Sequence, residues 1–198
     1  MGIGKQAKTL SRKQVDMICS HLGESTQNGK RNQLIFLLTV KTGLRAKEVA
    51  FLRWEMVLTS DGEIGHTLSL PNSSSKGRSG RVVPLHSDVR QLLSELHTAL
   101  RCERFDPTDW IIRSQRSPRV SPQVIVNMFQ RWYRDIGLVG CSSHSGRRTF
   151  ITDAAKRVSQ VGGSLRDVQV MAGHSSLQTT QRYIDYDTES QRKLVNLL

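Results

Sequence analysis

Apolar residues recur at helical spacing over much of the chain. Ser11 opens a capping-box pattern, and Val15, Ile18 and Leu22 follow it three or four positions apart, which predicts a first helix. A second helix is expected over about 32–41, ahead of a Thr-Gly pair where glycine can adopt the left-handed cap conformation. The same criteria predict further helices over about 46–54, 87–104, 122–136, 144–158, 164–173, 176–183 and 188–198.

Two short stretches alternate as β-strands do. Residues 64–70 and 81–85 flank a Ser/Gly/Lys-rich loop at 71–80, which predicts a hairpin with a flexible, basic tip. The sequence contains no repeats and no low-complexity linker. The predicted fold class is therefore mainly α with a small β-hairpin (α+β), as a single domain over 8–198 after a flexible tail at 1–7.

Charge adds the first indication of a partner. The 198 residues include 29 Lys and Arg against 17 Asp and Glu, a formal net charge of +12. Such an excess of positive charge on a compact domain favours a polyanion as the binding partner, because binding phosphates releases condensed counterions. The basic residues are dispersed through predicted elements, which indicates a shaped binding face, although small basic proteins without a specific partner are also common.

Other classes of protein are disfavoured by what the sequence lacks. No apolar run approaches the roughly 18 residues of a membrane span, and the N-terminus has no apolar stretch typical of secretion. Cys19, Cys102 and Cys141 are far apart and form no Cys-x-x-Cys pair, which disfavours a disulfide framework. We therefore expect a cytoplasmic protein that does not contact a membrane.

Four stretches contain residues suited to phosphate chemistry. Arg45 follows a glycine turn at a helix start, where an arginine and free backbone amides can bind phosphate together. Lys76 on the hairpin tip could protonate a leaving group or simply be solvated. His144 and Arg147 are three apart on a predicted helix and so share a face. In the fourth stretch, Gly173-His-Ser-Ser, a tyrosine follows nine residues after the histidine.

A metal site is not expected from these residues. His144 and His174 lie 30 positions apart, and no carboxylate accompanies either at the spacing of a metal ligand.

In this order, the four stretches resemble the catalytic domain of the tyrosine recombinases, the phage-integrase family. The boxes Thr-Gly-Leu-Arg, Lys-Gly…Arg-Val-Val-Pro-Leu, His-x-x-Arg and Gly-His-Ser-Ser…Thr-Thr…Tyr carry the resemblance, which covers about residues 8–198. It implies a site-specific recombinase that cleaves and rejoins double-stranded DNA through a 3′-phosphotyrosyl intermediate, with no metal and no cofactor. By this resemblance the catalytic residues are Arg45, Lys76, His144, Arg147, His174 and the nucleophile Tyr183, with Glu48 in support.

The chemistry of these residue types fits that activity. Two arginines can bind the non-bridging phosphate oxygens, where charge grows in the transition state. A tyrosine, with an ordinary pKa of about 10, needs its proton removed, and His144 is the expected acceptor. His174 is expected to hydrogen-bond the phosphate and Lys76 to protonate the departing 5′ oxygen. Contacts with DNA are expected from Arg78, Arg81 and Arg148, and solvent exposure is the alternative for Arg148.

The other two tyrosines are weaker candidates for the nucleophile. Tyr133 lies beside Trp132 in a predicted helix, which favours packing. Tyr186 stands between Asp185 and Asp187, whose charges oppose a phosphate.

The chain also departs from the family. Most members carry an N-terminal helical domain that binds the other side of DNA, whereas here the motifs begin with Arg45. We expect a naturally minimal recombinase, with an excised catalytic fragment as the alternative. Such a chain is expected to act as a dimer or tetramer on DNA, with an accessory DNA-binding protein as a further partner. The apolar tail (Leu194, Val195, Leu197 and Leu198) would dock on a neighbouring protomer or pack on its own domain.

Two other functions share the same motifs. One is a DNA-binding accessory protein of a recombination system whose catalytic set is unused. The other is DNA relaxation of the type IB topoisomerase kind, which would leave no recombinant product.

Overall fold

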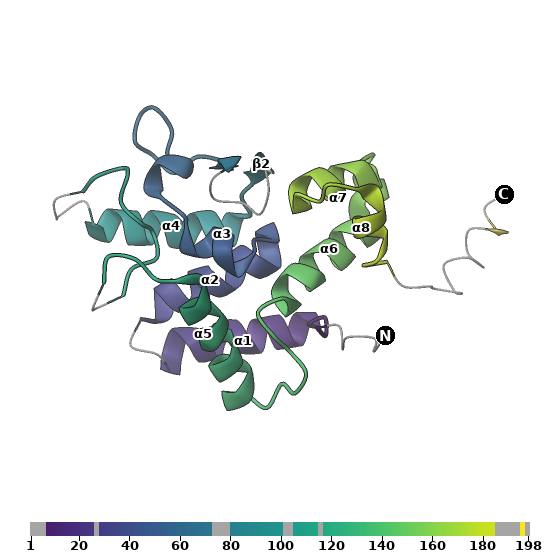
Figure 1. Cartoon of the computed structure of the whole chain (residues 1–198), viewed down its shortest axis with the longest axis horizontal. Coiled ribbons are helices and arrows are strands. Elements are labelled where there is room, and N and C mark those ends of the chain that lie inside the picture. The colour runs from purple at the N-terminus through teal and green to yellow at the C-terminus, as the bar shows by residue number, and fades with distance from the viewer. Residues whose placement is uncertain are drawn as a thin grey trace.

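A computed structural model describes residues 7–25, 28–72, 80–100, 105–114, 117–184 and 195–196 (Figure 1). These residues form a mostly helical fold with one two-stranded antiparallel sheet, which confirms the predicted fold class. The helices are α1 Arg12–Ser25, α2 Gly29–Thr42, α3 Ala46–Ala50, α4 Ser87–Leu100, α5 Pro122–Asp135, α6 Ser145–Arg157, α7 Leu165–Ala172 and α8 Leu177–Gln181. The 3-10 turns are η1 Trp54–Met56 and η3 Val158–Val161, and the strands are β1 Thr67–Leu70 and β2 Arg81–Pro84.

Helix α2 lies at the centre of the fold. Its run from Leu34 to Val40 is buried on every side, as expected for a helix without a polar face. Helices α1, α4 and α6 all pack against it, and α5 packs against α3 (Figure 1). We call α1 to α5 with the hairpin the body, because one continuous apolar core runs through them.

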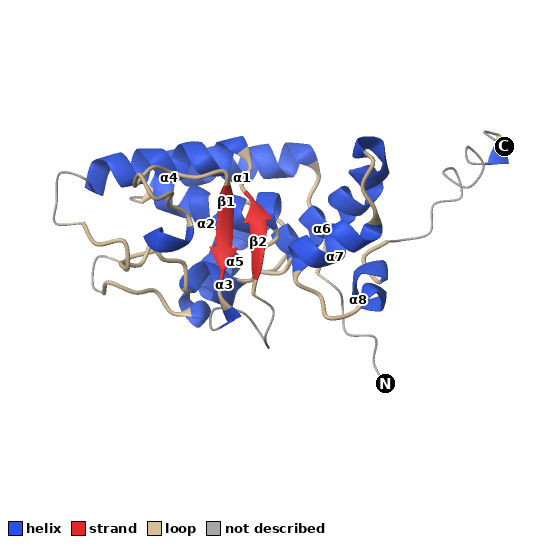
Figure 2. Cartoon of the chain, turned by 90° about the horizontal axis from the view of Figure 1, so that it is seen from above, coloured by secondary structure: helices blue, strands red, loops and turns tan. Residues whose placement is uncertain are grey.

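Helices α6, α7 and α8 form a smaller group at one end of the body (Figure 2). We call residues 145–184 the α6–α8 segment. Its own apolar cluster consists of Ile151, Val168 and Ala172, with Tyr183 among the side chains packed against it. A cluster of this size buries little apolar area, so other contacts must help to hold the segment in place.

The hairpin presents one face to the body. Thr67 pairs with Pro84 and Leu70 pairs with Arg81, and the pleat turns Leu68, Leu70 and Val83 inward. Arg81 belongs to the same inward face and is buried with them. A charged side chain on the apolar face of a strand requires partners, and these lie in the candidate site.

The N-terminal segment before α1 packs on the α6–α8 segment. Leu10 is buried, and its backbone N–H donates to Thr149 Oγ1 at 2.8 Å. Residues 1–6 of the predicted tail lie outside the described residues.

Some predicted boundaries are wrong. The helix expected over 46–54 ends at Ala50, because Arg53 pairs as an isolated β-bridge with Trp110 and a 3-10 turn follows. The strand expected from residue 64 begins at Thr67. The helix expected over 87–104 is described to Leu100 only, and the one expected from 188 lies outside the described residues apart from Val195 and Asn196.

Among the described residues, no helix is long and apolar enough to cross a membrane.

Candidate active site

The site begins at the corner between α2 and α3. Gly43 follows α2 with φ of 70°, a left-handed conformation that glycine adopts without strain. Arg45 then caps α3: its backbone N–H donates to Glu48 Oε2 at 2.8 Å, and its guanidinium contacts Glu48 Oε1 at 2.8 Å. The Arg-x-x-Glu spacing thus makes a closed cap that fixes the direction of the arginine.

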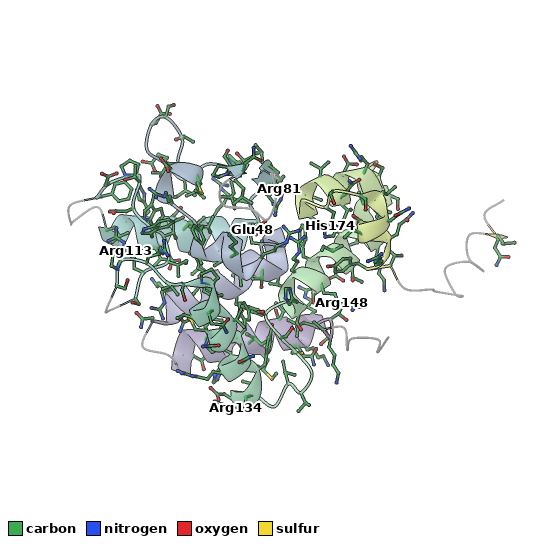
Figure 3. All side chains as sticks on the ribbon, viewed as in Figure 1. Glu48, Arg81, Arg113, Arg134, Arg148 and His174 are labelled. Carbon is green, nitrogen blue, oxygen red and sulfur yellow. The ribbon has the colours of Figure 1, made fainter. Side chains whose placement is uncertain are left out.

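Glu48 is fully buried and is bonded to two arginines, Arg45 and Arg81. Glu48 and Arg81 are labelled in Figure 3. Arg81 from β2 donates to both carboxylate oxygens, at 2.9 Å to Oε1 and 3.1 Å to Oε2. Burial alone would raise the pKa of Glu48, but the hydrogen bonds and charges of Arg81 and Arg45 outweigh it and lower the pKa. Glu48 is therefore ionised at neutral pH and has no free oxygen to offer a metal or a substrate.

Arg147 enters the site from the first turn of α6. Gly146 allows this approach, because a Cβ there would collide with Thr39 Oγ1 of α2. The Arg147 guanidinium donates to Gly43 O at 2.5 Å and to Ala172 O at 2.6 Å. Burial, and then the charge of Arg45, lower the pKa of Arg147 to about 10, so it stays protonated at neutral pH.

Three arginines meet at the C-terminal end of α7. Arg81 Nε donates to Met171 O at 2.8 Å, Arg147 to Ala172 O, and Arg45 to Gly173 O at 3.3 Å. Carbonyls at a helix C-terminus lack intrahelical partners and carry the negative end of the helix dipole, so cations stabilise them. The α6–α8 segment is thus joined to the body through a polar contact as well as an apolar one.

His174 follows α7 directly and is held on several sides. Its Nδ1 lies 2.9 Å from Thr180 Oγ1, and its carbonyl accepts from Gln169 Nε2 at 2.9 Å. The ring stacks on Tyr183 with centroids 5.4 Å apart. Burial, followed by the charges of Arg147, Arg45 and Arg81, lowers the pKa of His174 to about 4, so the ring is neutral at physiological pH.

Tyr183 follows α8 and is half-buried. Its backbone N–H donates to Thr180 O at 3.0 Å, and its carbonyl accepts from Thr152 Oγ1 of α6 at 3.1 Å. Its side chain borders a pocket of about 410 Å³, together with Ala7, Gly140, Ser142, His144, Arg147, Arg148, Thr179 and Arg182. The pocket is basic, since its described lining contains three arginines and no carboxylate.

The structure brings together Arg45, Glu48, Arg147, His174 and Tyr183, and places His144 on the same pocket. His144 is the exposed residue that precedes α6, and Arg148 is half-buried at the pocket wall. Lys76 and Arg78 lie outside the described residues, as does Tyr186. Tyr133 is buried against Phe129, which confirms the prediction that it packs in the core.

The expectation that Arg81 contacts DNA is corrected. Its side chain is 4% exposed, and Nε, Nη1 and Nη2 all donate to Glu48 or Met171. A guanidinium in this position has no free edge to offer to a phosphate.

Sequence reasoning also missed residues that support the site. Thr180 contacts His174 through its hydroxyl, Gln169 holds the His174 backbone, and Thr152 holds that of Tyr183. The two adjacent threonines in the tyrosine box were a signal for the first of these. Within the described ranges, no three His, Cys, Asp or Glu side chains are grouped so that they could hold a metal ion.

Residues 8–190 match the Phage integrase family, and the chain belongs to that family. It is homologous to the tyrosine recombinases, and its fold is that of their catalytic domains.

Individual relatives show the extent of the match. The tyrosine recombinase XerA of Thermococcus onnurineus is 30% identical over 189 residues, which are 94% of this chain and 61% of that protein. The XerH site-specific recombinase bound to its difH substrate, in a pre-cleavage complex, superposes with a TM-score of 0.73 at 19% identity, over 98% of this chain and 55% of that one. A lambda integrase dimer bound to a core site superposes with a TM-score of 0.68 at 22% identity, over 90% of this chain and 48% of that one. The chain thus spans about three fifths or less of these proteins.

Proposed function

We propose that this chain is the catalytic domain of a site-specific DNA recombinase that cleaves and rejoins strands through a 3′-phosphotyrosyl intermediate. One observation carries the proposal: two fixed arginines, a neutral histidine and a tyrosine converge where the only nearby described carboxylate, Glu48, is already paired. The family membership supports it, because tyrosine recombinases are strand transferases.

Arg45 and Arg147 would bind the scissile phosphate. A guanidinium has five N–H donors, and the hydrogen bonds described above use two on each residue. The remaining donors are held in place before substrate arrives. Preorganised cations of this kind stabilise charge on the non-bridging oxygens without reorganisation during the reaction.

His174 would donate a hydrogen bond to the same phosphate. When the Thr180 hydroxyl donates to Nδ1, the ring proton resides on Nε2, which is then the donor. The pKa of about 4 keeps the ring in this neutral form at physiological pH. The role of the Thr180 hydroxyl is to select the tautomer.

Tyr183 would be the nucleophile. Its phenolic oxygen attacks the phosphorus as its proton passes to His144, and the bond from phosphorus to the 5′ oxygen breaks. Lys76 protonates the departing 5′ oxygen, which leaves a 3′-phosphotyrosyl link and a free 5′ hydroxyl. Attack on that link by a 5′ hydroxyl of another strand reverses the step and reseals the DNA. The bond energy is kept in the link, so the reaction needs no cofactor and no metal.

Double-stranded DNA is the proposed partner, in the cytoplasm. Arg148 borders the pocket and, with Arg78 of the hairpin loop, is proposed to contact the DNA backbone. The chain would act as a dimer or tetramer on DNA, with an accessory DNA-binding protein where affinity for one site is low. The related XerH and lambda integrase structures both contain DNA, the latter with a dimer.

The test is a nicked suicide substrate made from DNA that flanks the gene. We expect a covalent protein–DNA adduct with wild type in the presence of EDTA. Tyr183→Phe should form none, yet bind the same DNA with nearly unchanged affinity, because it loses one hydroxyl and no charge. An adduct in Tyr183→Phe would reject this nucleophile, and cleavage that depends on a divalent cation would reject the mechanism. Relaxation of supercoiled DNA without strand exchange would instead identify a topoisomerase-like activity.

A further inference from the structure

We propose that Arg81 is a positioning residue for strand cleavage, which locks Glu48 behind Arg45 and holds the end of α7 from which His174 and Tyr183 follow. This inference rests on the proposed function and extends it to a residue that does not touch the substrate. Arg81 is labelled in Figure 3 beside Glu48, between the body and the α6–α8 segment.

Arg81 makes a double contact with Glu48. Its Nη1 and Nη2 each donate to one carboxylate oxygen, and Arg45 Nη1 also donates to Oε1. A fork with two bonds fixes the plane of the carboxylate, which a single bond cannot do. Arg45 donates to Glu48 from its backbone N–H and from Nη1, so the orientation of Arg45 depends on Arg81 through this carboxylate.

Arg81 also contacts the C-terminal end of α7. Arg81 Nε donates to Met171 O, and the guanidinium lies against Gly173, where a Cβ would come within 2.7 Å of Nη1. Gly173 has φ of 62°, so it closes α7 in a conformation that suits glycine. Arg81 thus packs on the residue immediately before His174.

Arg81 also differs from the two arginines proposed to bind phosphate. Arg45 is 24% exposed, and Arg147, although buried, borders the pocket beside Tyr183. Arg81 is 4% exposed, is not among the described residues that line this pocket, and is engaged at all three nitrogens. Arg81 can therefore act only through the groups it holds. It is also the first residue of β2, five positions after Lys76, so the same side chain anchors the strand that follows the hairpin loop.

The experiment compares Arg81→Met with wild type in single-turnover cleavage of the suicide substrate, well below the melting temperature. Arg31→Met is the matched control, because Arg31 is a half-buried arginine that also donates to a backbone carbonyl, that of Arg113, away from the site. We expect cleavage by Arg81→Met to be about 100-fold slower, the effect of a misplacement near 1 Å, and cleavage by Arg31→Met to change little. DNA affinity and its salt dependence should match wild type for Arg81→Met.

The pH profile separates positioning from a general loss of structure. In Arg81→Met, Glu48 keeps its ion pair with Arg45, which caps α3, and its electrostatic interaction with Arg147 of α6. It loses its bidentate partner. Its pKa should rise, so cleavage should fall off at higher pH than in wild type as Glu48 takes up a proton and releases Arg45. Arg31→Met should keep the wild-type profile. Arg81→Lys, which keeps the charge without the fork, serves the same comparison if Arg81→Met does not fold.

Three results would overturn the inference. Weaker DNA binding with a salt slope reduced by about one would make Arg81 a phosphate contact after all. If Arg81→Met cleaved at the same rate per folded molecule as Arg31→Met, with the pH profile of wild type, the role of Arg81 would be structural only. Unchanged amide exchange at 171–174 in Arg81→Met would show that α7 does not depend on it. This last measurement needs no activity, so it tests the hold of Arg81 on α7 separately from the proposed function, even if wild type forms no adduct.

Discussion

The body and the α6–α8 segment are held together by different forces. The body has a continuous apolar core around α2, in which Phe36, Leu38 and Phe129 are fully buried. The segment has a small apolar cluster of its own, and hydrogen bonds from three arginines tie its α7 carbonyls to the body. The site is assembled from both: Arg45 and Glu48 come from the body, and Arg147, His174 and Tyr183 come from the segment.

The comparison shows how several arginines can lie close together in a half-buried site. Several positive charges in a half-buried site would repel one another without compensation. Here Glu48 and the carbonyl end of α7 supply the negative partners. The contacts that join the two regions are therefore the same contacts that prepare the site.

The largest expected effect distinguishes a residue that transfers a proton, Lys76, from one that stabilises charge, Arg45. Lys76→Ala should slow cleavage of ordinary DNA by 100-fold or more, as about 10² to 10⁴ is typical of a general acid. A 5′-bridging phosphorothiolate has a sulfur leaving group that needs little protonation, so on it the variant should approach the wild-type rate. Arg45→Ala should be slow on both substrates, because its role is at the non-bridging oxygens.

Single-turnover rates on the two substrates decide this prediction. Equal defects of Lys76→Ala on both, or none on either, would remove Lys76 from the general-acid role. Arg78 would then be the next residue to test, since it is two positions from Lys76 in the sequence, whereas Arg81 is buried.

A smaller effect is expected at the close contact between the two regions. Gly146→Ala places a methyl group against Thr39 Oγ1 and should push α6 from α2, at a cost of about 1–3 kcal/mol in the free energy of unfolding. Cleavage should fall more than DNA affinity, because Arg147 follows Gly146 and moves with α6. The double variant Gly146→Ala/Thr39→Ala removes the hydroxyl that the new methyl group would meet, so it should recover part of the lost stability and rate, with Thr39→Ala alone as the control.

Urea unfolding and single-turnover rates test this contact. If Gly146→Ala retained both wild-type stability and the wild-type rate, the close approach of α2 and α6 would not control the position of Arg147.

The smallest effect concerns pH. The folded pKa of His174 is about 4 against an ordinary 6.5, so between these values the unfolded chain binds the proton and the folded chain does not. Stability from this group is therefore full above pH 6.5 and is lost as pH falls toward 4. In His174→Gln, the free energy of unfolding should change less between pH 6.5 and pH 4 than it does in wild type. Urea unfolding at a series of pH values measures this dependence. A variant curve parallel to the wild-type curve would refute the shift.

Most of the described helices could be predicted from the sequence, because helix signals are local patterns. The boxes also contained Arg45, Arg147, His174 and Tyr183, which the fold brings together. Ser121 followed by proline marked the start of α5, and Gly43 the end of α2. Arg45 and Glu48 are three positions apart, so their pairing was within reach of a spacing argument.

The partners of Arg81 could not be predicted in this way. Glu48 is 33 positions away and Met171 is 90 positions away, so only the packed fold brings them together. An arginine in a basic loop sequence fits DNA contact equally well, which is why that expectation was wrong. The early end of α3 has the same origin, since the bridge from Arg53 to Trp110 joins residues distant in sequence.

The arginine contacts at α7 also have a consequence for the order of folding. They close loops of 90 residues between Arg81 and Met171 and of 128 between Arg45 and Gly173. Contacts so distant in sequence form late, because their loop entropy must be offset by structure already present. During synthesis Tyr183 also emerges after Arg45, Arg81 and Arg147. On the proposed mechanism, a chain that is still folding would therefore be unable to cut DNA until its last elements dock.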